Sequence, residues 1–123
     1  MEEFLNTEID LLAPSIGNIH GDYPPSGPKL DYERLDKIAK QVKERAILAL
    51  HGTNDFEPAV MQRCIKAGAI KLNINKLILE RWKIHLSHNA HKPQTQLMDE
   101  GIDILREETE RWMDICGCSG RAP

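Results

Sequence analysis

The sequence predicts a single α/β domain over residues 1–123, in which parallel strands alternate with helices. Three short apolar runs stop at polar or glycine-containing turns, the pattern of strands buried on both faces of a sheet: Asp10–Ile19, Ala46–His51 and Ala69–Ile74. Because helical stretches lie between these runs, the repeated order of strand and helix indicates parallel strands joined by right-handed crossovers. A length of 123 residues suits one domain with a real core but falls well short of a complete eight-unit barrel.

Four helices are predicted, over Asp31–Arg45, Glu57–Ala67, Lys76–Leu86 and Gln96–Cys116. In the first, apolar side chains recur at spacings of three and four opposite a charged face, and Asp31 provides a capping residue. Asp55, shortly before Pro58, is expected to open the second helix. A polar loop is expected over Ser87–Thr95, and the small, polar tail Gly117–Pro123 is expected to fray.

Composition excludes several classes of function. A net charge of −3 gives no electrostatic reason to expect binding to nucleic acid or to an anionic membrane. No apolar run approaches the ~20 residues that span a bilayer, and the acidic start Met1-Glu2-Glu3-Phe4 lacks the features of a secretory signal. The three cysteines do not form a disulfide framework, so a reducing, cytoplasmic setting is expected.

The polar residues with the clearest pattern follow the three predicted strands. His20 and Gly21 end the first strand, His51 and Gly52 end the second, and Asn73 ends the third together with Asn75. His20 and His51 are 31 residues apart, about one βα unit, so parallel strands would bring them to the same rim. Neutral imidazole is a good zinc ligand, although the spacing alone leaves a structural role equally open.

The same rim has features suited to a phosphate group. Gly21 and Gly52 let the backbone pass close to a bound molecule and expose an N–H to it. Thr53 and Asn54 come just before the second predicted helix, whose N-terminal amides favour an anion.

Two further groups of potential metal ligands are expected to be incidental. His85, His88 and His91 recur every three residues but run into a polar loop, so we expect a solvated cluster. Cys116 and Cys118 lie beside the tail without a second ligand pair, which argues against a structural zinc site.

Three motifs together resemble the class II, zinc-dependent ketose-bisphosphate aldolases. The stretch Ala13-Pro14-Ser15-Ile16-Gly17-Asn18-Ile19-His20-Gly21-Asp22-Tyr23 resembles their glycine-asparagine-x-histidine-glycine segment. Leu48-Ala49-Leu50-His51-Gly52 resembles their strand that ends in the next zinc histidine, and Gly68-Ala69-Ile70-Lys71-Leu72-Asn73-Ile74-Asn75 looks like their last barrel strand. The resemblance covers nearly the whole chain, and the order and spacing of the motifs are specific.

The resemblance implies a partial TIM (β/α)8 barrel made of the last three βα units plus a C-terminal helix. It implies a lyase that cleaves or condenses a ketose bisphosphate such as fructose 1,6-bisphosphate, giving dihydroxyacetone phosphate and an aldehyde. Zinc would be the cofactor, polarising the ketose carbonyl. His20 and His51 match two of the three zinc histidines. The residues that match substrate or phosphate contacts, or stand at those positions with altered side chains, are Gly21, Gly52, Thr53, Asn54, Asn73, Asn75 and Lys76.

The family's general base and third zinc histidine belong to a segment upstream of Met1, so no catalytic residue is assigned within this chain. The partners implied are a phosphorylated ketose and either a second copy of the chain or a complementary half-barrel. Three other interpretations stay open: a non-catalytic remnant that binds sugar phosphate, one half of a split aldolase completed by another polypeptide, and a fragment of an ordinary aldolase.

Overall fold

The computed structural model describes residues 1–121 and divides the chain into two compact units, Met1–Ile74 and Asn75–Pro123. Residues 122–123, the end of the predicted tail, lie outside the described part. The expectation of a single domain stays a prediction.

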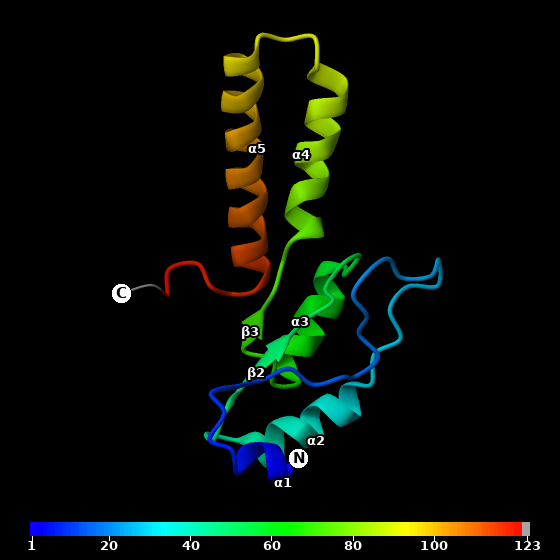
Figure 1. The fold of residues 1–123 in the computed structure, drawn as a ribbon, viewed down its shortest axis with the longest axis vertical. Coiled ribbons are helices and arrows are strands. Elements are labelled where there is room, and N and C mark those ends of the chain that lie inside the picture. Colours follow the sequence, from blue (N-terminus) through cyan, green and yellow to red (C-terminus); the bar gives the residue numbers. More distant parts are fainter. Residues whose placement is uncertain (122–123) are drawn as a thin grey trace. The chain divides into compact units, whose positions relative to one another are not determined.

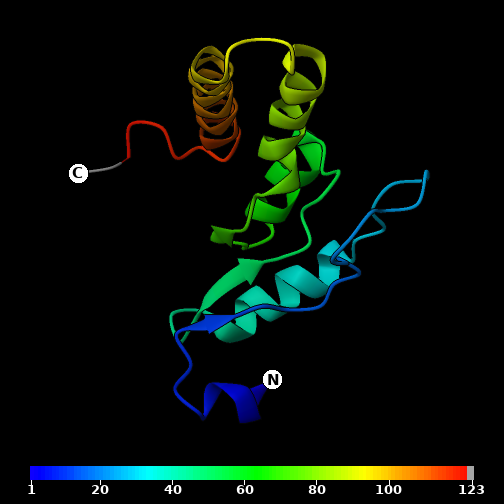
Figure 2. The ribbon, with the colours of Figure 1, turned by 45° about the horizontal axis from the view of Figure 1, so that its top comes forward.

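A small parallel sheet forms the centre of the first unit. Its strands are β1 (Leu11–Leu12), β2 (Ile47–Leu50) and β3 (Lys71–Leu72), in the order β1-β2-β3. Leu11 and Leu12 pair with Ile47 and Leu48, and Ala49 and Leu50 pair with Lys71 and Leu72, all in parallel register. The predicted α/β class with parallel strands is therefore confirmed. Figure 2 shows β1 and β2 as neighbouring arrows.

The strands are shorter than predicted, above all the first. The expected strand Asp10–Ile19 is wrong beyond Leu12, because Pro14 has no N–H to donate to a ladder and Gly17 turns the chain with φ +94°. Ile16, which is 1% exposed, instead accepts a hydrogen bond from the Asp31 amide through its carbonyl oxygen. The chain leaves the sheet early and forms a long loop that ends at α2.

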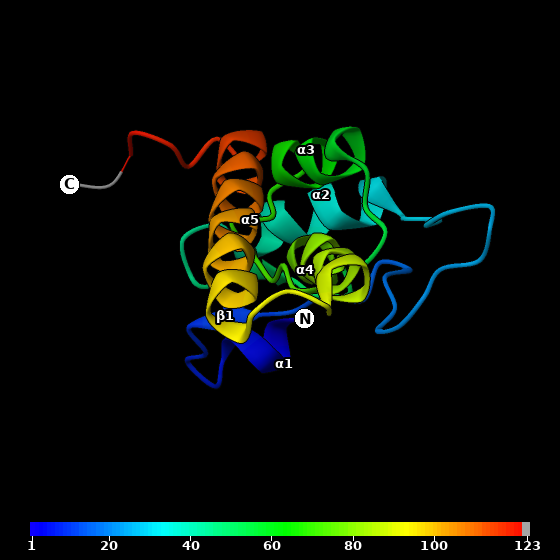
Figure 3. The ribbon, with the colours of Figure 1, turned by 90° about the horizontal axis from the view of Figure 1, so that it is seen from above.

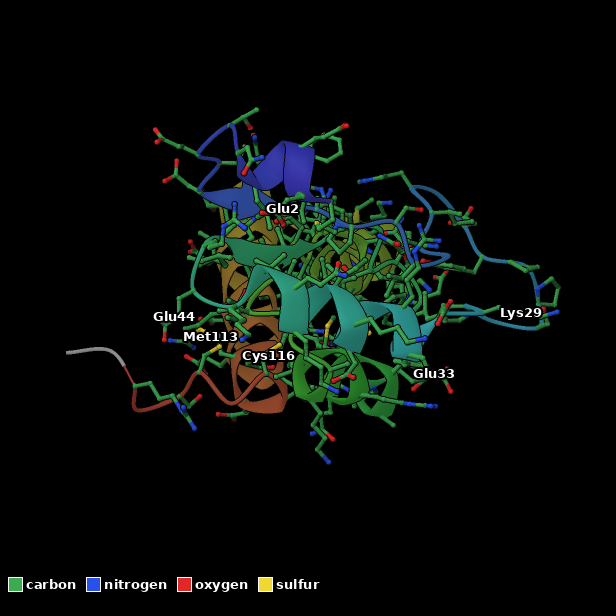
Figure 4. The ribbon with its side chains drawn as sticks, turned by 90° about the horizontal axis from the view of Figure 1, so that it is seen from below. Glu2, Lys29, Glu33, Glu44, Met113 and Cys116 are labelled. Atoms are coloured by element: carbon green, nitrogen blue, oxygen red, sulfur yellow. The ribbon has the colours of Figure 1, made fainter. Side chains whose placement is uncertain are left out.

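Two helices cover the sheet of the first unit, α2 (Tyr32–Val42) and α3 (Pro58–Lys66). Both lie on the same side of the strands, as right-handed crossovers in this strand order require (Figure 3). The predicted cap of α2 is confirmed: an Asp31 carboxylate oxygen accepts a 2.9 Å hydrogen bond from the Arg34 amide. Figure 4 shows Glu33 in the first turn of α2 and Glu44 just past its end.

The expectation that Asp55 opens α3 is wrong. The residue at the cap position is Glu57, which makes no capping hydrogen bond, and Pro58 occupies the start of the helix. A short helix that the sequence reading missed, α1 (Glu2–Leu5), precedes the sheet. Arg45, beyond α2, binds the Glu2 carboxylate at 2.5 Å and ties α1 to the unit.

The second unit is an antiparallel pair of helices, α4 (Lys76–Asn89) and α5 (Gln94–Ile115), which lie side by side (Figure 1). The connection is shorter than the predicted loop Ser87–Thr95, because α4 continues to Asn89 and α5 begins at Gln94. In residues 1–121, no helix has the length and apolar character that crossing a bilayer requires.

Two buried titratable side chains of this hairpin, Glu108 and His85, are hydrogen-bonded. Glu108 is 4% exposed and accepts hydrogen bonds from Arg81 at 3.2 Å and Arg111 at 2.6 Å. His85 is also buried: its Nε2 lies 3.0 Å from the Leu97 carbonyl oxygen, and its Nδ1 lies 3.3 Å from the Asn89 amide nitrogen. The expectation of a solvated cluster is therefore wrong for His85, which joins the two helices, whereas His88 and His91 are exposed.

Candidate functional site

His20 and His51 meet in the first unit although 31 residues separate them. His51 directly follows β2, and His20 lies in the long loop that follows β1. Their ring centroids are 5.7 Å apart, with an angle of 65° between the ring planes. Two imidazoles bound to one tetrahedral zinc ion at ~2.0–2.1 Å have centroids about 5 Å apart. The observed spacing therefore suits a pair of ligands to one ion, and the two residues fit zinc in the chemistry of their donors.

Side-chain hydrogen bonds join the two histidine-bearing loops. The Asn18 amide donates to the His51 carbonyl oxygen at 3.0 Å, while its own oxygen accepts from the Ile16 amide at 2.8 Å. The Tyr23 hydroxyl accepts from the Ile19 amide at 3.0 Å and donates to the Gly52 carbonyl oxygen at 2.7 Å. Through Tyr23, hydrogen bonds thus connect the residue before His20 to the residue after His51.

Gly52 allows the backbones of the two loops to approach closely. Its φ is +64°, a conformation that glycine adopts readily and other residues rarely adopt. A Cβ atom at this position would overlap the Ile19 carbonyl oxygen and lie 2.8 Å from its carbon. A glycine is therefore required here by packing between the loops, in addition to any role towards a ligand.

Thr53 and Asn54 use their side chains within the protein. The Thr53 hydroxyl, buried at 3% exposure, donates to the Asn73 carbonyl oxygen. The Asn54 amide donates to the Gly21 carbonyl oxygen at 3.1 Å. Gly21 itself is exposed, and no atom beyond its chain neighbours lies within 4 Å of where a Cβ would stand. The Thr53 hydroxyl is thus occupied by a hydrogen bond within the protein.

Asn73 links the third strand to His51. Its amide nitrogen donates to the Leu50 carbonyl oxygen at 3.1 Å, and its side-chain nitrogen lies 3.5 Å from His51 Nδ1. The Lys71 ammonium donates to the Asn73 side-chain oxygen. Asn75 and Lys76 belong to the second unit, where they are the N-cap and first residue of α4.

Sequence reasoning missed the residues whose hydrogen bonds join the loops of the two histidines. Asn18, Tyr23 and Asp55 each make a hydrogen bond across 29 to 33 residues, which no local pattern reveals. An Asp55 carboxylate oxygen accepts from the Tyr23 amide at 3.3 Å. Burial raises the pKa of the Tyr23 phenol above its ordinary value, although its bond from Ile19 acts in the opposite direction. The hydroxyl therefore stays protonated and able to donate.

The described part of the chain offers two candidate metal ligands rather than a complete set. Within residues 1–121, no three histidine, cysteine or acidic side chains converge so that they could hold a metal ion. A zinc ion at His20 and His51 would thus need further ligands from water or from another segment.

A comparison of the sequence with models of known protein families gives a match. The sequence model of the class-II fructose-bisphosphate aldolases matches residues 1–121. The chain belongs to this family. Its three motifs, interpreted above as a resemblance, are therefore those of a class-II aldolase.

The most similar aldolases include fungal and bacterial proteins. A protein of Coccidioides immitis (strain RS), provisionally named a fructose-bisphosphate aldolase, is 38% identical over 122 residues, which are 98% of this chain and 40% of that protein. A fructose-bisphosphate aldolase of Streptococcus pneumoniae serotype 4 is 28% identical over 132 residues, which are 96% of this chain and 45% of the relative.

Solved aldolase structures match the same portion. The crystal structure of a Coccidioides immitis protein, provisionally named a fructose-1,6-bisphosphate aldolase, superposes with a TM-score of 0.91 at 36% identity, covering 98% of this chain and 42% of that one. The YdjI aldolase of Escherichia coli K12 gives a TM-score of 0.88 at 28% identity, covering 98% and 45%. The chain therefore spans less than half the length of the aldolases that it matches.

Proposed function

We propose that this chain supplies the C-terminal portion of a zinc-dependent aldolase that acts on a phosphorylated ketose such as fructose 1,6-bisphosphate. The observation that carries the proposal is the His20–His51 pair, whose ring centroids are 5.7 Å apart although His20 lies in the loop after β1 and His51 directly follows β2. A zinc ion, when bound, would supply Lewis-acid polarisation of the ketose carbonyl. The setting would be the cytoplasm.

The other proposed site residues act by binding and orientation. Exposed backbone at Gly21, together with the backbone of Gly52, would approach a phosphate, and Thr53 and Asn54 would hold this backbone in shape through their hydrogen bonds. Asn73 would orient His51 and contact substrate from the end of β3.

The first unit also favours a partner that completes a barrel, and we propose that the three βα units are the last of eight. Leu11 and Ile47 are register partners on β1 and β2, yet they are 49% and 45% exposed. An exposed apolar pair on a three-stranded parallel sheet is unfavourable, because such sheets are normally covered on both faces. A complementary half-barrel, or a second copy of the chain, would cover it and could supply the missing ligand and base.

The coverage of relatives favours a second candidate function. Since the chain spans 40% to 45% of the curated relatives and holds two histidines of the proposed ligand set, it could bind zinc and sugar phosphate without turnover. An assay of fructose 1,6-bisphosphate cleavage with added zinc tests whether the chain is active without a partner. We expect no turnover from the chain alone; turnover would show that it contains a base and is a self-sufficient enzyme.

Zinc binding tests the proposal directly. Isothermal titration of the full chain with Zn²⁺ should give one site, and His20→Ala or His51→Ala should weaken it at least about tenfold, because each removes a ligand. His88→Ala, on the exposed side of α4, is the matched control and should bind as the parent does. Binding that does not depend on His20 and His51 would refute the site.

A further inference from the structure

The Tyr23 hydroxyl is a single group that touches the main chain on both sides of the histidine pair. It accepts from the amide of Ile19, the residue before His20, and donates to the carbonyl oxygen of Gly52, the residue after His51. A phenol has one proton to donate, and a carbonyl oxygen can only accept, so the direction of both bonds is fixed. Each loop is thus joined to the other through one oxygen atom.

The rest of Tyr23 is held in place, which makes its hydroxyl a fixed point. Its ring centroid lies 5.9 Å from that of Phe56, a side chain that is 2% exposed. Its own amide donates to Asp55 at 3.3 Å. Because ring and backbone are both anchored, movement of either loop would strain or break the bonds at the hydroxyl.

This placement bears on how the two imidazoles are spaced. A metal site tolerates ligand displacements of only about 0.2 Å around the ideal distances. His20 itself lies in a loop and is exposed, so its position is set by the bonds of neighbouring residues rather than by a strand. The Tyr23 oxygen provides such a bond one residue away, at Ile19.

We propose that Tyr23 is a positioning residue for the His20–His51 metal site: its hydroxyl bridges Ile19 and Gly52 and so fixes the spacing of the two imidazoles. This inference rests on the proposed zinc site. It assigns no contact between Tyr23 and metal or substrate; the residue acts through the two loops. Loss of the hydroxyl should therefore reduce metal affinity while both ligands remain.

The test is the zinc affinity of Tyr23→Phe, which removes one oxygen atom and keeps the ring beside Phe56. In the full chain, titrated with Zn²⁺ and shown by circular dichroism to be folded, we expect binding about tenfold weaker or more, the usual range for groups that orient ligands. The matched control is Tyr32→Phe. Tyr32 lies under the Arg63 guanidinium at 3.8 Å, and its hydroxyl makes no hydrogen bond with any residue that the structure describes. It should bind as the parent does.

The outcomes separate this inference from the proposed function. If the parent binds zinc through both histidines and Tyr23→Phe binds equally well, the positioning role is overturned and the metal site stands. If the parent binds no zinc, or binds it without His20 and His51, both are overturned. Hydrogen exchange of the parent supplies a measurement that needs no variant. The protection factor, which is the exchange rate of an amide in an unfolded chain divided by its rate in the folded protein, should be larger for the Ile19 amide than for the exposed Gly21 amide. Equal protection factors at the two amides would overturn the bridge itself.

Discussion

The backbone of Gly52 lies against the carbonyl group of Ile19, at a distance that leaves no room for a side chain at position 52. This contact brings the residue after one candidate zinc ligand against the residue before the other. It therefore couples the fold of the first unit to the geometry of the site.

Gly52→Ala should disrupt both stability and metal binding. The alanine Cβ would overlap Ile19. The alanine backbone would also have to adopt φ +64°, which alone costs roughly 1–2 kcal/mol for a residue with a side chain. With the overlap added, we expect the free energy of unfolding to fall by about 2–4 kcal/mol and zinc binding to be lost. Urea unfolding and zinc titration measure the two effects.

Gly21→Ala is the control for this substitution. Gly21 also has a positive φ, +128°, but no atom beyond its chain neighbours lies within 4 Å of its Cβ position. The cost should therefore be limited to backbone strain. Equal losses at the two positions would show that contact with Ile19 is unimportant.

The sequence was sufficient for features that depend on local chemistry. Asp31 was correctly assigned as the cap of α2, because a capping carboxylate and the amide it accepts from lie only three residues apart. The alternation of strands and helices, and hence the rim where His51 and Asn73 meet, followed from apolar runs and their spacing.

Features that depend on distant partners could not be predicted in this way. Asp55 is of a residue type that often caps helices. In the structure it instead has φ +58° and accepts a hydrogen bond from the Tyr23 amide 32 residues away. His85 looked like one of three solvated histidines, and only the pairing of α4 with α5 reveals the Leu97 carbonyl oxygen beside its ring. In both cases tertiary contacts overrode the local pattern.

Gly101→Ala should destabilise the helical hairpin. In an exposed helix this change normally stabilises by up to about 1 kcal/mol, since alanine has the higher helix propensity. Here a Cβ would run into the ring of Trp82 on the facing helix, whose Cη2 atom would lie 2.5 Å away. We expect the free energy of unfolding to fall by about 1–3 kcal/mol. A thermal melt measures the change in melting temperature, which should be negative. A higher melting temperature than that of the parent would rule out close packing at this position.

Glu108→Gln should weaken the same hairpin through its ion pairs. The buried carboxylate accepts from Arg81 and Arg111, and the neutral amide would keep the size but lose the charge that strengthens both bonds. We expect a loss of about 1–3 kcal/mol by urea unfolding. Glu107→Gln is the matched control, because Glu107 is 60% exposed and lies 3.9 Å from Arg81. Its effect should stay within about 0.5 kcal/mol, and a comparable effect of the two substitutions would contradict a special role for the buried carboxylate.

Cys64 should make the stability of the first unit depend on pH in the alkaline range. The thiol is fully buried in α3, and burial raises its pKa from 9.0 to about 11. Between these values the folded thiol keeps its proton while the unfolded one loses it, so stability is complete below pH 9 and falls as pH rises towards 11. Relative to Cys64→Ala, the parent should lose about 2 kcal/mol over this range. Urea midpoints of both proteins at pH 8, 9, 10 and 11 measure the difference, which also cancels the titration of lysines and tyrosines common to both. A difference that stays constant with pH would mean that the Cys64 thiol ionises as easily in the folded protein as in the unfolded chain.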